Sequence, residues 1–189
     1  RSTVGTITEI YDYLRLLFEK LGVPYCPIHK IPAEKHSITE ATKKILKVLA
    51  GKRGYVMAQV SQKGRVFDNK ILLGEILKDG YQRIWIPSKK EIIEISDPKA
   101  AKKAASKDDF FIVIDRLAFN AADEGRVGDS VAQAYEAYAR YNSGVTARKC
   151  QVQTTDNVTL NFSEDLTCPE CDYQPPTLNS RLFSFNSPL

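Results

Sequence analysis

Two cysteines, Cys168 and Cys171, enclose a proline and a glutamate in the last quarter of the sequence. Thiolates at this spacing on a tight turn can bind one zinc ion when a second pair of ligands completes the tetrahedron. A redox-active dithiol would instead need a helix after the second cysteine, and Pro175 and Pro176 disfavour one. The pattern therefore favours half of a zinc site, with a redox pair or buried structural thiols as the alternatives.

A second pair with ligand spacing, Cys26 and His29, follows the expected end of the first helix. Taken alone, this pair is explained by coincidence at least as well as by coordination. Together the two pairs supply four ligands, so they could share one metal ion if the fold brings them together. The remaining cysteine, Cys150, lies in a strand pattern and is expected to be a small core residue rather than a ligand.

The sequence shows no grouping that would support hydrolysis or phosphoryl transfer. The segment Gly51-Lys52-Arg53 lacks the earlier glycine of a phosphate-binding loop. The chain has two histidines, and carboxylates such as Asp115 and Glu164 stand singly, so no acid–base pair or activated nucleophile is apparent. We therefore expect these residues to act by binding and not as an enzyme by themselves.

Side chains suited to protein recognition alternate along the expected strand 81–86. Ile84 and Ile86 would point to one face, and Tyr81, Arg83 and Trp85 to the other. An arginine between aromatic side chains is typical of binding hot spots, because it joins forked hydrogen-bond donors to rigid contact area. The alternative is a face covered by a helix, with Trp85 in the core and Arg83 reaching the rim.

Periodicity and turn signals predict helices and strands that interleave along the chain. The expected helices cover Thr6–Leu21, Ser37 to about Gly51, Lys70–Lys78 and Ser130–Tyr141. The expected strands cover Gly54–Val60, Tyr81–Ile86, Glu91–Ile95, Phe110–Leu117, Lys149–Thr154 and Val158–Phe162. Several neighbouring strands form hairpins, so the predicted class is α+β, an antiparallel or mixed sheet with helices packed on it. His36 is expected at the surface.

Composition and charge narrow the class of protein. The 189 residues are 43% apolar and 26% charged, which is a globular composition. A net charge of +4, spread along the chain, does not indicate a nucleic-acid groove. No apolar run approaches the length of a membrane span, and the first residues lack the apolar core of a secretion signal, so we expect a cytoplasmic protein without membrane contact.

The two ends of the chain resemble the UvrA family, the damage-recognition subunits of the bacterial UvrABC excinuclease. Residues 1–18 are similar to the segment that follows the first nucleotide-binding motif of the family, and Cys168–Cys171 with Ser180–Leu189 are similar to its zinc-knuckle region. Between the ends the match is weaker in residues but keeps its order, and it covers the insert that docks UvrB in such proteins.

The resemblance implies three parts and a parent protein. Residues 1–30 would be a helix and a Cys/His turn of the parent's ATPase signature region, residues 31–163 the UvrB-binding domain, and residues 164–189 half of a zinc knuckle with a return segment. The chain would thus be a piece of a larger, zinc-containing DNA-repair ATPase. ATP would bind elsewhere in that parent, which is expected to act on damaged DNA as a homodimer.

The resemblance also implies site residues. Gly80–Arg83 and Val113–Arg116 fall where the family has a Gly-Tyr-x-Arg strand and an Asp-Arg strand end with partner-binding arginines. Arg83 and Arg116 are therefore the implied UvrB-binding residues, and they would pair with acidic groups of the partner. Strand alternation, not the resemblance, adds Tyr81 and Trp85 to the expected UvrB-binding residues.

For the metal, the resemblance implies two separate half-sites for zinc. Cys168 and Cys171 would begin a four-cysteine module, and Cys26 and His29 would contribute to another module, each completed elsewhere in the parent protein.

A second hypothesis is a nucleic-acid-binding module that uses a basic loop. Its phosphate contacts would come from Lys63 and Arg65 and from lysines of the segment 96–109, namely Lys99, Lys102, Lys103 and Lys107. The lysines of the segment 96–109 are better explained as a solvated, charged surface loop.

Overall fold

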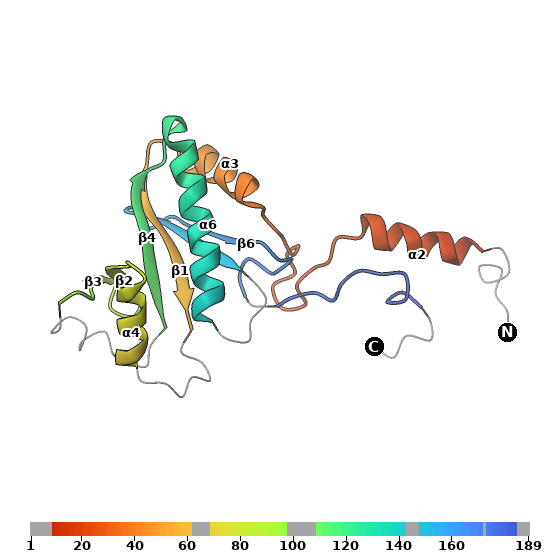
Figure 1. Ribbon diagram of the computed structural model, residues 1–189. Coiled ribbons are helices and arrows are strands. Elements are labelled where there is room, and N and C mark those ends of the chain that lie inside the picture. Colours follow the sequence, from red (N-terminus) through yellow and green to blue (C-terminus); the bar gives the residue numbers. More distant parts are fainter. Residues whose placement is uncertain (1–8, 62–68, 98–108, 143–147, 172, 185–189) are drawn as a thin grey trace. The chain divides into compact units, whose positions relative to one another are not determined.

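The computed structural model describes residues 9–61, 69–97, 109–142, 148–171 and 173–184 (Figure 1). The chain divides into two compact units. The end unit comprises residues 1–34 and 166–189, and the sheet unit comprises residues 35–165. Lys63, Arg65 and the four lysines of the basic loop lie outside the described residues.

The sheet unit is built on one antiparallel sheet of six strands in the order β3-β2-β4-β1-β5-β6. Each strand runs antiparallel to its neighbours, and the hairpins β2–β3 and β5–β6 form the two edges. The predicted α+β class is confirmed, with an antiparallel sheet. In chain order the strands are β1 (Arg53–Val60), β2 (Arg83–Ile86), β3 (Glu91–Glu94), β4 (Phe110–Ala118), β5 (Lys149–Thr154) and β6 (Thr159–Ser163).

The described helices of the sheet unit pack against one face of this sheet, which we call the inner face; the opposite face is the outer face. They are α3 (Ile38–Val48), α4 (Asn69–Lys78) and α6 (Glu124–Tyr141), the last preceded by the 3-10 turn η1 (Ala121–Asp123). Figure 1 shows α6 lying along β1 and β4, with α4 beside β2 and β3. α3 begins with the predicted capping box, in which Ser37 and Glu40 bond reciprocally and satisfy free backbone donors of the first turn.

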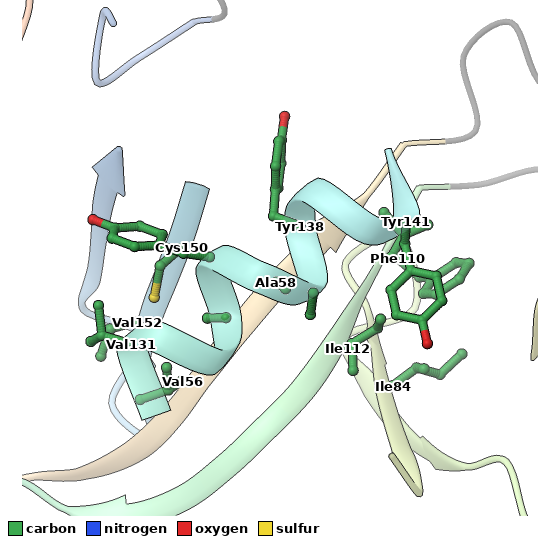
Figure 2. Packing of buried hydrophobic residues seen from close by; sticks show 14 of the residues in the cluster. Val56, Ala58, Ile84, Phe110, Ile112, Val131, Tyr138, Tyr141, Cys150 and Val152 are labelled. Atoms are coloured by element: carbon green, nitrogen blue, oxygen red, sulfur yellow. The ribbon is translucent and has the colours of Figure 1, made fainter. Parts of the chain in front are cut away.

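The core lies between the helices and the inner face of the sheet (Figure 2). Alternate strand residues point into it because side chains of a β-strand alternate between faces. Cys150 of β5 is 2% exposed, so its predicted role as a core residue is confirmed, and burial raises the pKa of its thiol to about 12. Other members are Val56, Ala58, Ile84, Phe110, Ile112, Val131, Tyr138, Tyr141 and Val152.

Three sequence predictions need correction. α6 begins at Glu124, well before the predicted start at Ser130, because Gly125 and Gly128 lie within the helix and weaken its sequence signal. β2 begins at Arg83, so Tyr81 lies before the strand. The surface position expected for His36 is wrong: its residue is 9% exposed and its ring packs edge-on to Phe162, with ring centroids 5.2 Å apart.

The end unit contains α2 (Ile10–Leu21), which ends at Gly22 as predicted. The described helix carries no buried residue, and apolar side chains such as Leu17 are exposed. The Tyr11 hydroxyl donates a hydrogen bond to the carbonyl oxygen of Phe183, which ties the helix to the C-terminal segment of the same unit. Among all the described helices, none combines the length and the apolar character needed to cross a lipid bilayer.

At Gly54, the backbones of β1 and β5 approach so closely that there is no room for a side chain. A Cβ atom at this position would lie 2.5 Å from the carbonyl oxygen of Gln153 on β5 and 2.9 Å from the ring of Phe119. Because the backbone of β5 is held by its pairing, we expect Gly54→Ala to lower the free energy of unfolding by about 1–3 kcal/mol. Urea titration followed by the emission of Trp85, the only tryptophan of the chain, measures the change in the sheet unit.

Gly74 of α4 provides the matched control, because a Cβ atom there would meet no neighbour within 4 Å among the described residues. Helix propensity predicts that Gly74→Ala leaves the sheet unit as stable as before or more stable by up to about 1 kcal/mol. Equal stability of the Gly54→Ala variant and the wild type would contradict the close packing of β1 against β5.

Candidate functional site

A groove of about 610 Å³ opens at the step where β4 extends beyond the shorter β2. In the pairing of β2 with β4, Ile84 lies opposite Ile112 and Trp85 opposite Phe111, so the later part of β4 borders the groove. We call it the arginine groove because Arg83, Arg116 and Arg126 line it. The structure thus brings together Arg83 and Arg116, which the sequence placed on different strands.

Arg83 reaches the outer face through the alternation of β2. Ile84 and Ile86 point to one face, as predicted, and are buried there, while the side chain of Arg83 is 52% exposed. Its guanidinium lies 4.0 Å from the carboxylate of Glu94 on β3, and the Glu94 side chain is 55% exposed. An ion pair this long and this exposed contributes little, so Arg83 stays available for an external partner.

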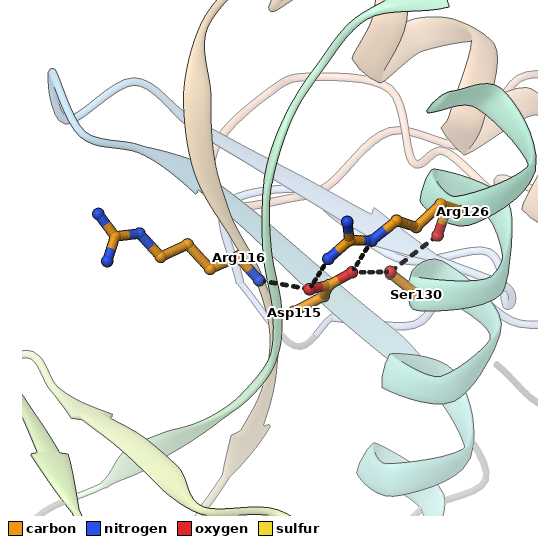
Figure 3. Close-up of polar contacts among 4 residues, drawn as sticks. All are labelled: Asp115, Arg116, Arg126 and Ser130. Atoms are coloured by element: carbon orange, nitrogen blue, oxygen red, sulfur yellow. Dashed lines mark hydrogen bonds and ion pairs between the residues drawn. The ribbon is translucent and has the colours of Figure 1, made fainter. Parts of the chain in front are cut away.

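A bulge in β4 decides which side of the sheet Asp115 faces and which side Arg116 faces. Val56 pairs with Asp115 whereas Met57 pairs with Val113, so one extra residue is accommodated between them. Figure 3 shows Asp115 directed toward α6 and Arg116 directed away from it. The Arg116 guanidinium lies 5.8 Å from the centroid of the Tyr55 ring, a cation–π distance.

Asp115 is held by donors from two elements. Its carboxylate accepts hydrogen bonds from Nε and Nη2 of Arg126, both at 2.8 Å, from Oγ of Ser130 at 3.2 Å, and from the backbone N–H of Arg116 at 2.7 Å (Figure 3). Burial alone would raise the pKa of Asp115, but these donors, led by Arg126, hold it below its usual value. We call this arrangement of Arg126 and Ser130 on Asp115 the Asp115 clamp. It neutralises the one carboxylate among the described residues that line the groove, and it fixes the bulge from which Arg116 projects.

The two aromatic residues predicted beside Arg83 occupy different environments. Tyr81 lines the arginine groove, but its ring also packs against the hydrophobic core. Burial, followed by the nearby Asp79, raises the pKa of Tyr81. Trp85 is partly buried on the outer face of β2. The alternative, in which a helix covers Trp85 as a core residue, is therefore wrong for the described helices.

Arg126 and Tyr55 belong to the groove, and sequence reasoning missed both. Arg126 precedes the predicted start of its helix, so no helical face was assigned to it. Its spacing of one helical turn from Ser130 would have been informative, since residues at i and i+4 share a face. Tyr55 carried no comparable signal, because its role depends on the cross-strand pairing with Arg116.

The end unit contains a cluster of four metal-ligand side chains, Cys26, His29, Cys168 and Cys171, whose donor atoms lie within 4.8 Å of one another. The Sγ atoms of Cys26 and Cys171 are 3.7 Å apart, and Nδ1 of His29 lies 3.6 Å from the Sγ atoms of both Cys26 and Cys168. A zinc tetrahedron with ordinary bond lengths has edges of roughly 3.8 Å between sulfurs and roughly 3.6 Å between sulfur and nitrogen. The cluster could therefore hold a metal ion.

Local turns prepare the cluster for a cation. The backbone N–H of His29 donates to Sγ of Cys26 at 3.4 Å, and the turn closes with the N–H of Lys30 donating to the carbonyl oxygen of Cys26. Burial would raise the pKa of Cys26, but backbone hydrogen bonds from His29 and Ile28 outweigh it and lower the pKa to about 6. A backbone hydrogen bond at Tyr173 lowers the pKa of Cys171. Burial and the neighbouring sulfurs of Cys168 and Cys26 together outweigh it, so the pKa of Cys171 is raised.

The expectation of two separate half-sites is corrected by this arrangement. The resemblance assigned Cys26 and His29 to one module and Cys168 and Cys171 to another, whereas the structure places all four donors in one group. A set of three thiols and one imidazole fits a closed, four-coordinate zinc site. Cys150 is not part of the group, as predicted.

Comparison with known proteins identifies the family. The profile of the UvrA interaction domain matches residues 36–140, from the residue before the α3 cap to near the end of α6. The UvrABC system protein A of Haemophilus influenzae is 38% identical over 189 residues, that of Agrobacterium fabrum 35% over 204, and that of Staphylococcus aureus 35% over 189. The chain belongs to the UvrA family.

The UvrA relatives are much longer than this chain. Each comparison covers 100% of the chain but only 19–20% of the relative, so the chain spans about a fifth of their length. The residues of this chain that match the UvrA interaction domain, 36–140, include Arg83 and Arg116. The resemblance seen at the two ends of the sequence therefore extends over the whole chain.

The Asp115 clamp predicts acid sensitivity of the sheet unit. Because the folded-state pKa of Asp115 lies below the unfolded value of about 3.9, the carboxylate adds stability above that value and loses it as the pH falls through its folded pKa. We expect Asp115→Asn to flatten the loss of unfolding free energy between about pH 5 and pH 2. At neutral pH the variant should be less stable by about 1 kcal/mol, a modest value because the Arg126 side chain is 59% exposed.

Urea titrations at several pH values, followed by Trp85 emission, measure both effects. Asp129→Asn is the control, because Asp129 is an exposed residue of the same helix, α6. The role given to the clamp is wrong if Asp115→Asn and Asp129→Asn show the same dependence on pH.

Proposed function

We propose that this part of a UvrA-family protein recruits UvrB for nucleotide excision repair, and that it acts by protein binding rather than by catalysis. The observation that carries the proposal is the convergence of Arg83 and Arg116 on one open groove. The match to a UvrA interaction domain, and relatives named for the UvrABC system, support a partner from the same system.

The chemistry of the groove suits an acidic partner. A guanidinium binds a carboxylate through two parallel hydrogen bonds, which gives both strength and a fixed orientation. Arg83 has a long contact to Glu94, and Arg116 forms no ion pair with another described residue. Asp115 is already paired with Arg126, so its charge repels an approaching carboxylate little.

The outer face supports recruitment in a second way, because its groove is preformed. The bulge and the Asp115 clamp set the direction of Arg116 before any partner arrives. A side chain already held in its binding orientation loses less conformational entropy on association than a freely moving one. ATP binding, action on damaged DNA and homodimerisation are proposed for the longer parent protein, on the strength of the resemblance alone.

The four-donor cluster is proposed to hold one zinc ion. Cys26, His29, Cys168 and Cys171 would be its ligands, and with all four positions supplied by the protein the ion would be structural. A bound ion of this kind cross-links the turn at Cys26–His29 to the turn at Cys168–Cys171 within the end unit and stabilises that unit.

Binding to purified UvrB tests the proposed function. We expect Arg83→Ala to raise the Kd by roughly tenfold and Arg116→Glu to raise it more, because the second change replaces attraction with repulsion. Both variants should also weaken the dependence of the Kd on salt, since each removes a screened charge interaction. Calorimetric titration at several salt concentrations measures the two effects.

Lys78→Glu is the matched control for Arg116→Glu. Lys78 is an exposed residue of α4, on the helix-covered side of the sheet, and its substitution changes the net charge by the same amount. It should leave the Kd within about twofold of wild type. If Arg83→Ala and Arg116→Glu keep the fold and bind UvrB like the wild type, the assigned groove is wrong.

Metal analysis of the purified chain tests the zinc site. We expect close to one zinc ion per chain, and we expect Cys168→Ser to lose most of it, because a three-ligand remainder binds zinc more weakly. Cys150→Ala should keep the zinc, since Cys150 is a core residue of the sheet unit. Zinc content that is unaffected by Cys168→Ser would contradict the assigned ligands.

A further inference from the structure

A second, smaller hollow of about 270 Å³ lies on the sheet unit, and we call it the tryptophan hollow. Trp85 and Phe111 supply its aromatic wall, and the remaining lining residues come from the β2–β3 turn and the β5–β6 hairpin. Trp85 pairs in register with Ile92 of β3 on one side and with Phe111 of β4 on the other. An apolar row therefore crosses three adjacent strands of the outer face.

This row connects the tryptophan hollow to the arginine groove. Ile92 lines the groove, and Phe111 lines the hollow. Arg83 and Trp85 alternate with the buried Ile84 on β2, so both belong to the outer face. Residues two apart on a strand are separated by about 7 Å, so a partner that reaches Arg83 also lies within reach of Trp85.

The lining of the tryptophan hollow indicates what it can bind. Among its described lining residues only Lys90 is charged, and Gln151, Gln153 and Asn157 supply amide donors and acceptors. A nucleic-acid strand would need several cations along its backbone, which this lining does not offer. An apolar side chain between backbone amides suits it better, because aromatic walls provide contact area while carboxamides bond to the flanking peptide groups.

We propose that the tryptophan hollow is a second anchor point for the same acidic protein partner and receives one apolar or aromatic side chain of it. The partner segment would present a carboxylate to Arg83 and, about 7 Å away, an apolar side chain to Trp85 and Phe111. Residues i and i+2 of an extended segment have this spacing. The inference rests on the proposed function, and it adds the partner's apolar residue and the contribution of Phe111.

The two anchors differ in how they respond to salt. Charge pairs at Arg83 and Arg116 are screened by added salt, whereas burial of an apolar side chain against Trp85 is not. We therefore expect Trp85→Ala and Phe111→Ala each to raise the Kd for UvrB by roughly tenfold or more without changing its salt dependence. Tyr13→Ala, which removes an aromatic side chain that is 64% exposed on α2, is the control and should leave the Kd unchanged.

Acrylamide quenching of Trp85 emission gives a readout that needs no destabilising variant. Trp85 is the only tryptophan of the chain. Emission from the partner is removed by subtracting the emission of the complex that the Trp85→Phe variant forms with UvrB. We expect saturating UvrB to lower the quenching constant of Trp85 by about twofold or more, because the partner's side chain covers the indole. Unchanged quenching at saturation overturns the inference.

The outcomes separate the inference from the proposed function. If the arginine variants weaken UvrB binding while Trp85→Ala and Phe111→Ala do not, the second anchor is wrong and the proposed function stands. If none of the four variants weakens binding, both are wrong. If a single-stranded oligonucleotide protects Trp85 at about 0.15 M salt and UvrB does not, the hollow binds nucleic acid and the inference is overturned.

Discussion

The structure of the sheet unit depends on one constraint, the burial of a single face of a six-stranded antiparallel sheet under the described helices. Since side chains alternate along each strand, filling the inner face with Ile84, Ile86 and Ile112 places Arg83, Trp85 and Phe111 on the other side. The proposed binding surface is therefore a consequence of the way the core is built. A shift of one residue in the register of β2 would exchange the two sets.

Much of this arrangement could be predicted from the sequence, because alternation is a local property. The strands, the capping box at Ser37 and the exposed arginine of β2 all follow from patterns a few residues long. The bulge in β4 was not predictable in this way, since it arises from the pairing of β4 with β1. The Asp115–Arg126 clamp depends in turn on that bulge and on an N-terminal extension of α6 whose signal is weakened by glycines.

The group of four metal-ligand side chains shows a different limit of prediction from sequence. Each ligand pair was visible from its spacing, but which pairs join is decided by tertiary structure. The turns at Cys26–His29 and Cys168–Cys171 are far apart in the chain but belong to the same end unit. A backbone bridge between Glu34 and Thr167 aligns them. Backbone hydrogen bonds between Glu34 and Thr167 run in both directions, so the approach of the two turns does not depend on a bound ion.

The first and last residues of the sheet unit also lie together, since the backbone N–H of His36 donates to the carbonyl oxygen of Ser163 at 2.6 Å. A folded unit whose entry and exit points are adjacent can replace a short surface loop of a host protein without stretching the host's chain. The sheet unit is therefore suited to domain insertion. Residues 35–165 could be inserted as one segment into an unrelated scaffold protein, and the complete outer face would be transferred with them.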